Sequence, residues 1–90
     1  MEPNEIERWQ KDIVFLLDLA YKSNDRMVIG FTLRFAATYF FLRNKAEVAI
    51  DFAERAKNFF PPTSEFQSWL QQDIARYSNN ALKSPIGASN

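Results

Sequence analysis

Two pairs of carboxylates are the side chains best suited to acid–base chemistry in this 90-residue chain: Glu5 with Glu7, and Asp51 with Glu54. A catalytic pair needs a cleft and shifted pKa values, but these residues lie on expected polar helix faces or near a helix start. Asp51 precedes Arg55 by four positions, which fits a surface ion pair.

The chain has no histidine and no cysteine, which removes imidazole and thiolate catalysis and the usual zinc ligands. No glycine-rich phosphate loop or nucleophile elbow is present. We therefore expect no enzyme activity, no metal and no cofactor.

Composition favours one small helical domain. Hydrophobic residues make up 47% of the chain, enough for a core, and only two glycines and four prolines interrupt it. The formal net charge is zero, whereas proteins that bind nucleic acids usually carry a basic excess. The longest apolar window, Met27–Leu42, contains Arg34 and is too short for a membrane span. Without cysteines or a recognisable signal peptide, a cytoplasmic protein is expected.

Capping residues and hydrophobic periodicity predict four helices. Asn4 and Asn44 are expected N-caps, each followed three positions later by a glutamate. Residues 22–25, "KSND", form a break made of helix-capping residues, and the prolines at 61–62 stop the third helix. Thr63 or Ser64 is expected to cap the last helix. The predicted helices span about residues 5–21, 26–43, 45–59 and 64–78, within a single domain of residues 1–78, and residues 79–90 are expected to form a flexible tail.

The faces of these helices predict how they pack. The first helix has one apolar stripe, and the second is apolar around nearly its whole circumference, which is typical of a central helix. The third helix carries small residues on one face, so a neighbouring helix can approach closely while Phe35, Phe40 and Phe41 fill the space. Trp9 and Trp69 lie on apolar stripes and are expected in the core, with a place at an interface as the alternative. The expected stripe of the first helix is Ile6, Trp9, Ile13, Leu16, Leu17 and Ala20; that of the third is Ala46, Ala49, Ile50, Ala53, Ala56 and Phe60; that of the fourth is Phe66, Trp69, Leu70, Ile74 and Tyr77.

The segment of residues 30–61 resembles one degenerate tetratricopeptide repeat, a hairpin of two antiparallel helices. Its best-matching piece is "NKAEVAIDFAERAKNFFP". Ala37 replaces the glycine of the family pattern. The positions that carry the resemblance are Leu33, Ala36–Ala37, Phe40, Ala49, Ala56 and Pro61. The resemblance implies a hairpin flanked by a first and a fourth helix.

In such repeats the first helix lines a groove that holds peptide segments. The resemblance therefore implies that Phe31, Arg34, Thr38 and Phe41 bind a partner, and their spacing places them on one side of the second helix. Arg34 offers a planar set of donors to a carboxylate, supplied by a partner or internally by Asp12, Asp18 or Asp51. The alternative for Phe31 and Phe41 is a place in the core.

The sequence thus predicts a non-enzymatic protein–protein interaction module, a small adaptor or regulator that binds a protein or peptide. A homo-oligomer that buries its aromatic surface against another copy is the alternative. A nucleic-acid-binding regulator that uses the basic segment of residues 26–45 is a lesser alternative. It is weakened by Glu47, Asp51 and Glu54, because a recognition helix presents polar and basic side chains to the bases.

Overall fold

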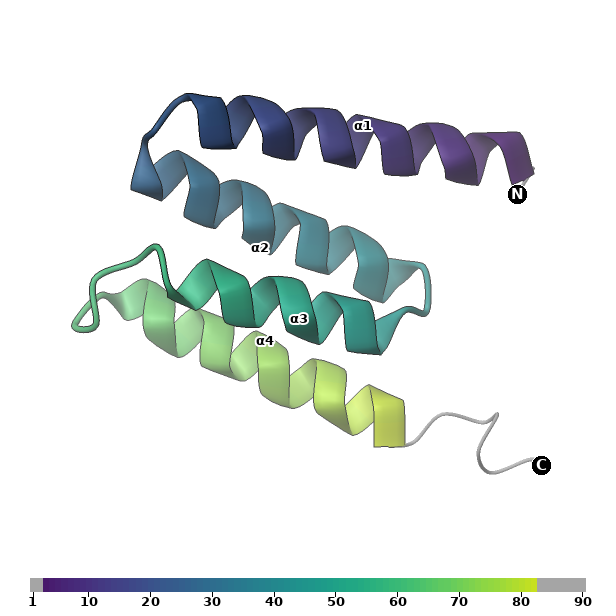
Figure 1. Cartoon of the computed structure of the whole chain (residues 1–90). Coiled ribbons are helices and arrows are strands. Elements are labelled where there is room, and N and C mark those ends of the chain that lie inside the picture. Colours follow the sequence, from purple (N-terminus) through teal and green to yellow (C-terminus); the bar gives the residue numbers. More distant parts are fainter. Residues whose placement is uncertain (1–2, 83–90) are drawn as a thin grey trace.

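The computed structural model describes residues 3–82, and within them it consists of four α-helices and no strand. Each helix runs antiparallel to the one before it (Figure 1). The all-α prediction is therefore confirmed. The helices are α1 (Pro3–Lys22), α2 (Arg26–Leu42), α3 (Ala46–Lys57) and α4 (Glu65–Leu82).

Two of the predicted helix starts are capped by the segments expected to cap them. Asp25, at the end of the "KSND" break, accepts hydrogen bonds from the backbone N–H groups of Met27 and Val28 at 3.0 and 3.3 Å. Ser64 accepts one from Phe66 at 3.1 Å. These side chains satisfy donors that have no partner within the first turn of a helix.

Both asparagines that the sequence predicted as N-caps have other roles. Helix α1 already includes Pro3 and Asn4, so Asn4 lies within the helix. Asn44 adopts the left-handed conformation with φ 63° and closes α2. Its N–H donates to Phe41 at 3.0 Å, and the N–H of Lys45 donates to Phe40 at 2.9 Å, which is the Schellman pattern. Lys45 occupies the N-cap position of α3 without a capping side chain.

The ends of α3 and α4 also differ from the prediction. Helix α3 ends at Lys57, with Asn58 as its C-cap, so the chain leaves the helix before Pro61 and not at it. Helix α4 continues to Leu82, which places residues 79–82 in a helix instead of the predicted tail. Residues 83–90 lie outside the described part of the chain.

Alanines bring α2 and α3 together, as predicted. Ala37 of α2 and Ala49, Ala53 and Ala56 of α3 are fully or almost fully buried. Their small side chains let the two helix backbones approach closely. The rest of this core comes mainly from Leu33 and from α4, in the form of Leu70, Ile74 and Tyr77.

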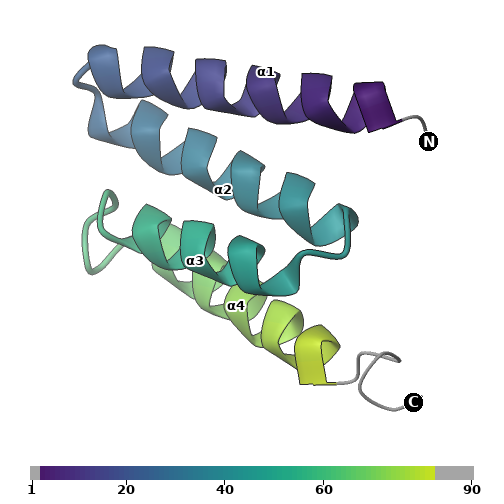
Figure 2. The same cartoon turned by 45° about the vertical axis from the view of Figure 1, so that its right-hand side comes forward.

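Helices α1 and α3 lie on opposite sides of α2, and α4 packs against α3 on the side of α2 that faces away from α1 (Figures 1 and 2). Helix α1 buries Ile13 and Ala20, and its main neighbour is α2. Leu16, expected in its buried stripe, is exposed, and the side chains of Ile6 and Trp9 lie outside the described part.

The described molecule is flat, with extents of 44 × 33 × 13 Å. None of its helices has the length and apolar character needed to cross a membrane.

Candidate functional site

An ion-pair network joins α2 to α4. The Nε of Arg34 donates to Asp73 Oδ2 at 2.9 Å, and Arg76 donates to Asp73 Oδ1 at 3.1 Å. Asp73 is 4% exposed and is the only buried charged residue in the described chain. A buried carboxylate is tolerated when charged donors satisfy it. Each carboxylate oxygen of Asp73 accepts a hydrogen bond from an arginine, which explains why this side chain can be buried.

Aromatic rings surround this network on the same side of α2. Phe31 packs edge-on against Phe60 and Phe66, with ring centroids 5.2 and 4.9 Å apart. Trp69 packs against Phe66 at 4.8 Å, and the Arg34 guanidinium lies 5.4 Å from the Trp69 ring. These contacts connect α2 to α4, and Phe31, Trp69 and the Arg34 guanidinium form a surface to which both helices contribute.

Several of these rings are open to solvent. Phe31 is 41% exposed, Phe35 is 55% exposed and Trp69 is 40% exposed. Phe35 follows Phe31 by one helical turn, so it extends the same surface. We call the surface formed by Phe31, Arg34, Phe35 and Trp69 the α2/α4 face.

The four predicted partner-binding residues have different surroundings. Phe31 and Arg34 belong to the face, and both are partly accessible. Thr38 is exposed, and its hydroxyl donates to the carbonyl of Arg34 at 3.2 Å. Phe41 is half-buried against Tyr77, with ring centroids 4.6 Å apart. Phe41 thus helps to join α2 to α4.

The internal partner of Arg34 is not one of the three aspartates that the sequence suggested. Asp18 pairs with Lys22 at 2.9 Å and Asp51 with Arg55 at 3.0 Å, each within its own helix. Asp73 is 39 residues from Arg34, so only the crossing of α2 and α4 brings the two together.

The sequence predicted two members of the face in the interior. Phe35 was expected to fill space above the alanines, and Trp69 was expected in the core. Both are instead on the open side of their helices. The signal that was available is their spacing from other aromatic residues, four positions after Phe31 and three after Phe66, which places each on a shared side with its neighbour.

Helix α1 extends the apolar surface beyond α2. The Tyr21 ring contacts Phe59 near the end of α3 at 5.9 Å, so this flank of α1 turns toward α3. Leu16 and Leu19 lie on the opposite flank of the buried Ile13–Ala20 line, and both are exposed. On α2, Val28 and Leu42 are also exposed, each seven residues from Phe35.

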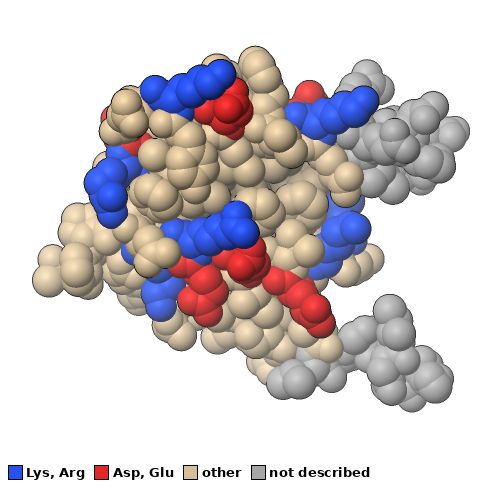
Figure 3. All heavy atoms as spheres, viewed as in Figure 1, with Lys and Arg blue, Asp and Glu red and all other residues tan. Residues whose placement is uncertain are grey.

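Both signs of charge are present on the side of the molecule that Figure 3 shows. Basic side chains occur over much of that side of the molecule, and several acidic side chains lie together near the lower centre of the view. Among the described residues, no group of histidine, cysteine, aspartate and glutamate side chains is arranged to hold a metal ion. The chemistry that the α2/α4 face itself offers is apolar contact, aromatic stacking and hydrogen bonding from a fixed guanidinium.

Comparisons of the chain with protein-family models, with curated proteins and with solved structures found no match.

Proposed function

We propose that this chain is a non-enzymatic protein–protein interaction module that binds a protein or peptide partner through the α2/α4 face. The observation that carries the proposal is the exposure of Phe31, Phe35 and Trp69 around the Arg34–Asp73 ion pair. Large aromatic residues and arginine dominate the binding energy of protein interfaces, and clustered exposed apolar groups mark such interfaces.

The ion pair gives the proposed face a defined shape before a partner arrives. Asp73 holds Arg34 through Nε, and the guanidinium lies over Trp69. Arg34 has further N–H donors beyond Nε, which are available to a partner. A side chain that is already fixed loses less conformational entropy on binding, so this arrangement favours affinity.

A tetratricopeptide-like arrangement is part of the proposal. The close α2–α3 hairpin with buried Ala37, Ala49 and Ala56 supports it. In that arrangement α2 is the first helix of the repeat, and α1 and α4 flank the hairpin. The α2/α4 face then corresponds to the groove side on which such repeats bind peptides.

Affinity capture with the full chain as bait, followed by binding measurements on the partner it identifies, tests the proposal. Trp69→Ala and Phe35→Ala are expected to weaken binding by about tenfold or more each, because a hot-spot residue is worth at least about 1–2 kcal/mol. Phe15→Ala is the matched control, since Phe15 is an exposed aromatic residue on α1, outside the face. Circular dichroism checks that each variant keeps its helices. Equal binding by all three variants would contradict the proposed face.

Self-association is the alternative, and the exposed apolar residues of α1 and α2 favour it as well. Light scattering coupled to size-exclusion chromatography separates the two. A mass of 10.5 kDa that does not change with concentration supports a separate partner, whereas a dimer mass that Trp69→Ala or Phe35→Ala abolishes supports a second copy. Nucleic-acid binding is the lesser candidate, because Glu47, Asp51 and Glu54 of α3 are all exposed.

A further inference from the structure

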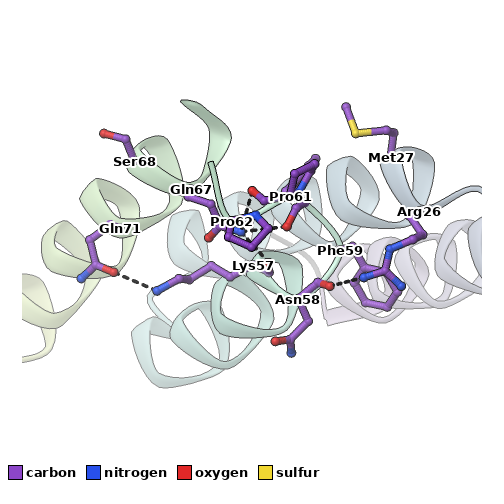
Figure 4. Close-up of a pocket in the computed structure, with 11 residues that line it drawn as sticks. Arg26, Met27, Lys57, Asn58, Phe59, Pro61, Pro62, Gln67, Ser68 and Gln71 are labelled. Carbon is purple, nitrogen blue, oxygen red and sulfur yellow. Dashed lines mark hydrogen bonds between the residues drawn. The ribbon is translucent and has the colours of Figure 1, made fainter. Parts of the chain in front are cut away.

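A hollow of about 940 Å³ lies at one end of the molecule, where the start of α2 meets the end of α3 and the beginning of α4 (Figure 4). Its size is within the range of roughly 300–1,000 Å³ that is usual for ligand pockets. Residues from all three helices and from the α3–α4 connection line it: Arg26, Met27, Lys57, Asn58, Phe59, Phe60, Pro61, Pro62, Gln67, Ser68 and Gln71.

Two cations line the hollow, and no carboxylate does. Arg26 and Lys57 are both among the lining residues. Every ion pair between described side chains involves other cations, namely Lys22, Arg34, Arg55 and Arg76. Two positive charges in a concave site with no acidic lining residue produce a potential that attracts an anion.

The positions of both cations are set by neighbouring groups. Arg26 donates to the carbonyl of Asn58, and its guanidinium lies 5.2 Å from the centre of the Phe59 ring. Lys57 Nζ donates to Gln71 Oε1 at 2.9 Å. These contacts place positive charge at the C-terminal end of α3, where it is favourable. Each cation has more N–H groups than these contacts use, so donors are left for a ligand.

One glutamine holds the walls of the hollow together. Gln67 Nε2 donates to the carbonyls of Lys57 and Phe60 at 2.8 and 3.0 Å. These bonds tie the beginning of α4 to the end of α3, and the close-up in Figure 4 shows them beside Pro61 and Pro62. The hollow is thus built in advance of a ligand, which reduces the entropy that binding costs.

The other residues that line the hollow favour a ligand that has an apolar part as well as a negative charge. Met27, Phe59 and the two prolines supply apolar surface, while Ser68 and Gln71 supply polar groups. A small inorganic anion satisfies the cations but leaves the apolar wall in water. A peptide with a carboxylate next to an apolar side chain uses both.

We propose that this hollow binds a short acidic peptide segment, with one carboxylate on Arg26, a second on Lys57, and an apolar neighbour on Met27 and Phe59. The site contains no residue of the α2/α4 face, so it goes beyond the proposed function and does not depend on it. A partner that engages both sites is anchored at two separate points on the chain.

Titration of the full isotope-labelled chain with a blocked tetrapeptide, acetyl-Leu-Glu-Glu-Leu-amide, tests the proposal by NMR. Saturable shifts at peptide concentrations up to about 1 mM are expected in the backbone amides of residues 26–27, 57–60 and 67–71. The glutamine analogue, acetyl-Leu-Gln-Gln-Leu-amide, is expected to bind at least about tenfold more weakly, because hydrogen bonds to charged groups are stronger than neutral ones.

A pair of lysine variants supplies the matched control. Lys57→Met removes the charge but keeps the apolar stem, and is expected to weaken binding of the glutamate peptide by about tenfold. Lys45→Met removes a charge at the other end of α3 and is expected to leave binding unchanged. Trp69→Ala is also expected to leave it unchanged, which separates this site from the α2/α4 face.

Three results would overturn the proposal: no saturable shift, equal affinity for both peptides, or shifts confined to residues outside the hollow. A shift pattern that sodium phosphate alone reproduces at the same concentration would also overturn it, because the site would then bind any anion without using its apolar wall.

Discussion

Asp73 is the residue that connects the two helices of the α2/α4 face. It lies almost fully buried and accepts hydrogen bonds from Arg34 and Arg76. Removing one partner from a buried ion pair leaves the other charge without compensation, which costs more than the net value of the pair. Arg34 and Arg76 are both partly exposed, so water offsets some of that cost.

Asp73→Ala is expected to lower the free energy of unfolding by about 1–3 kcal/mol, because charge-assisted hydrogen bonds are lost and Arg34 has no carboxylate partner. Urea unfolding followed by circular dichroism measures the change. Asp51→Ala is the matched control, since its ion pair with Arg55 is exposed on both sides, and is expected to cost less than about 1 kcal/mol. Similar losses in the two variants would show that the Asp73 network does not stabilise the fold.

At the scale of elements, the turn between α2 and α3 explains one incorrect prediction. Asparagine is favoured both as an N-cap and as a residue in the left-handed conformation that ends a helix. Asn44 followed by Glu47 fits the first role, but the backbone at Asn44 has φ 63° and serves the second. The local sequence permits both uses, and the antiparallel packing of α2 on α3 selects one.

The side chain of Phe60, in the α3–α4 connection, lies so close to α2 that position 30 has room only for a glycine. A Cβ atom at this position would lie 2.6 Å from the Phe60 ring, and Phe60 is itself buried. A glycine within a helix costs up to about 1 kcal/mol relative to alanine, so its place here reflects the need for space. Phe60 packs into that space and joins the end of α3 to α2.

Gly30→Ala is therefore expected to destabilise the protein by about 1 kcal/mol or more, because the overpacking penalty of roughly 1–3 kcal/mol exceeds the gain in helix propensity. Urea unfolding measures the change. The double variant Gly30→Ala with Phe60→Leu is expected to recover part of the loss, relative to Phe60→Leu alone, because the smaller side chain makes room. A more stable Gly30→Ala variant would mean that the Phe60 ring moves aside at little cost.

At the scale of the whole molecule, α1 forms an outer edge that is packed mainly against one other helix, α2. Helices α2, α3 and α4 share the buried cluster, whereas α1 adds Ala20 to it and has α2 as its main neighbour. Segments with few buried contacts open at lower free energy than the core. Helix α1 also exposes Val14, Phe15, Leu16 and Leu19, so the outer edge is apolar as well as weakly held.

Hydrogen exchange measured by NMR is expected to show lower protection for the amides of α1 than for those of α2 and α3 at low protein concentration. The difference should reach at least about tenfold in rate, since a gap of 1.4 kcal/mol in opening free energy corresponds to that factor. Protection of α1 that rises with protein concentration would identify a second copy as its cover. Equal protection in all four helices of the monomer would contradict the view that α1 is weakly held.

The sequence determined the local features of this protein. The alanine stripe at 49, 53 and 56 and the capping segments at 22–25 and 63–64 depend on neighbours within a turn or two, so periodicity and capping rules predicted them. The same rules placed Phe31, Arg34 and Thr38 on one side of a helix. Helix ends were predicted less well, because asparagine at position 44 fits two conformations and α3 ends before its prolines.

Tertiary structure decided which of those side chains face solvent and which carboxylate serves Arg34. The pairing with Asp73 spans 39 residues and depends on how α4 crosses α2, which no local pattern specifies. Helical spacing places Phe35 and Phe31 one turn apart, but only the positions of the neighbouring helices leave Phe35 exposed. The hollow between Arg26 and Lys57 likewise exists because three separate segments meet at one end of the molecule. Contacts between residues distant in sequence require the complete fold, and for that reason they could not be predicted from the chain alone.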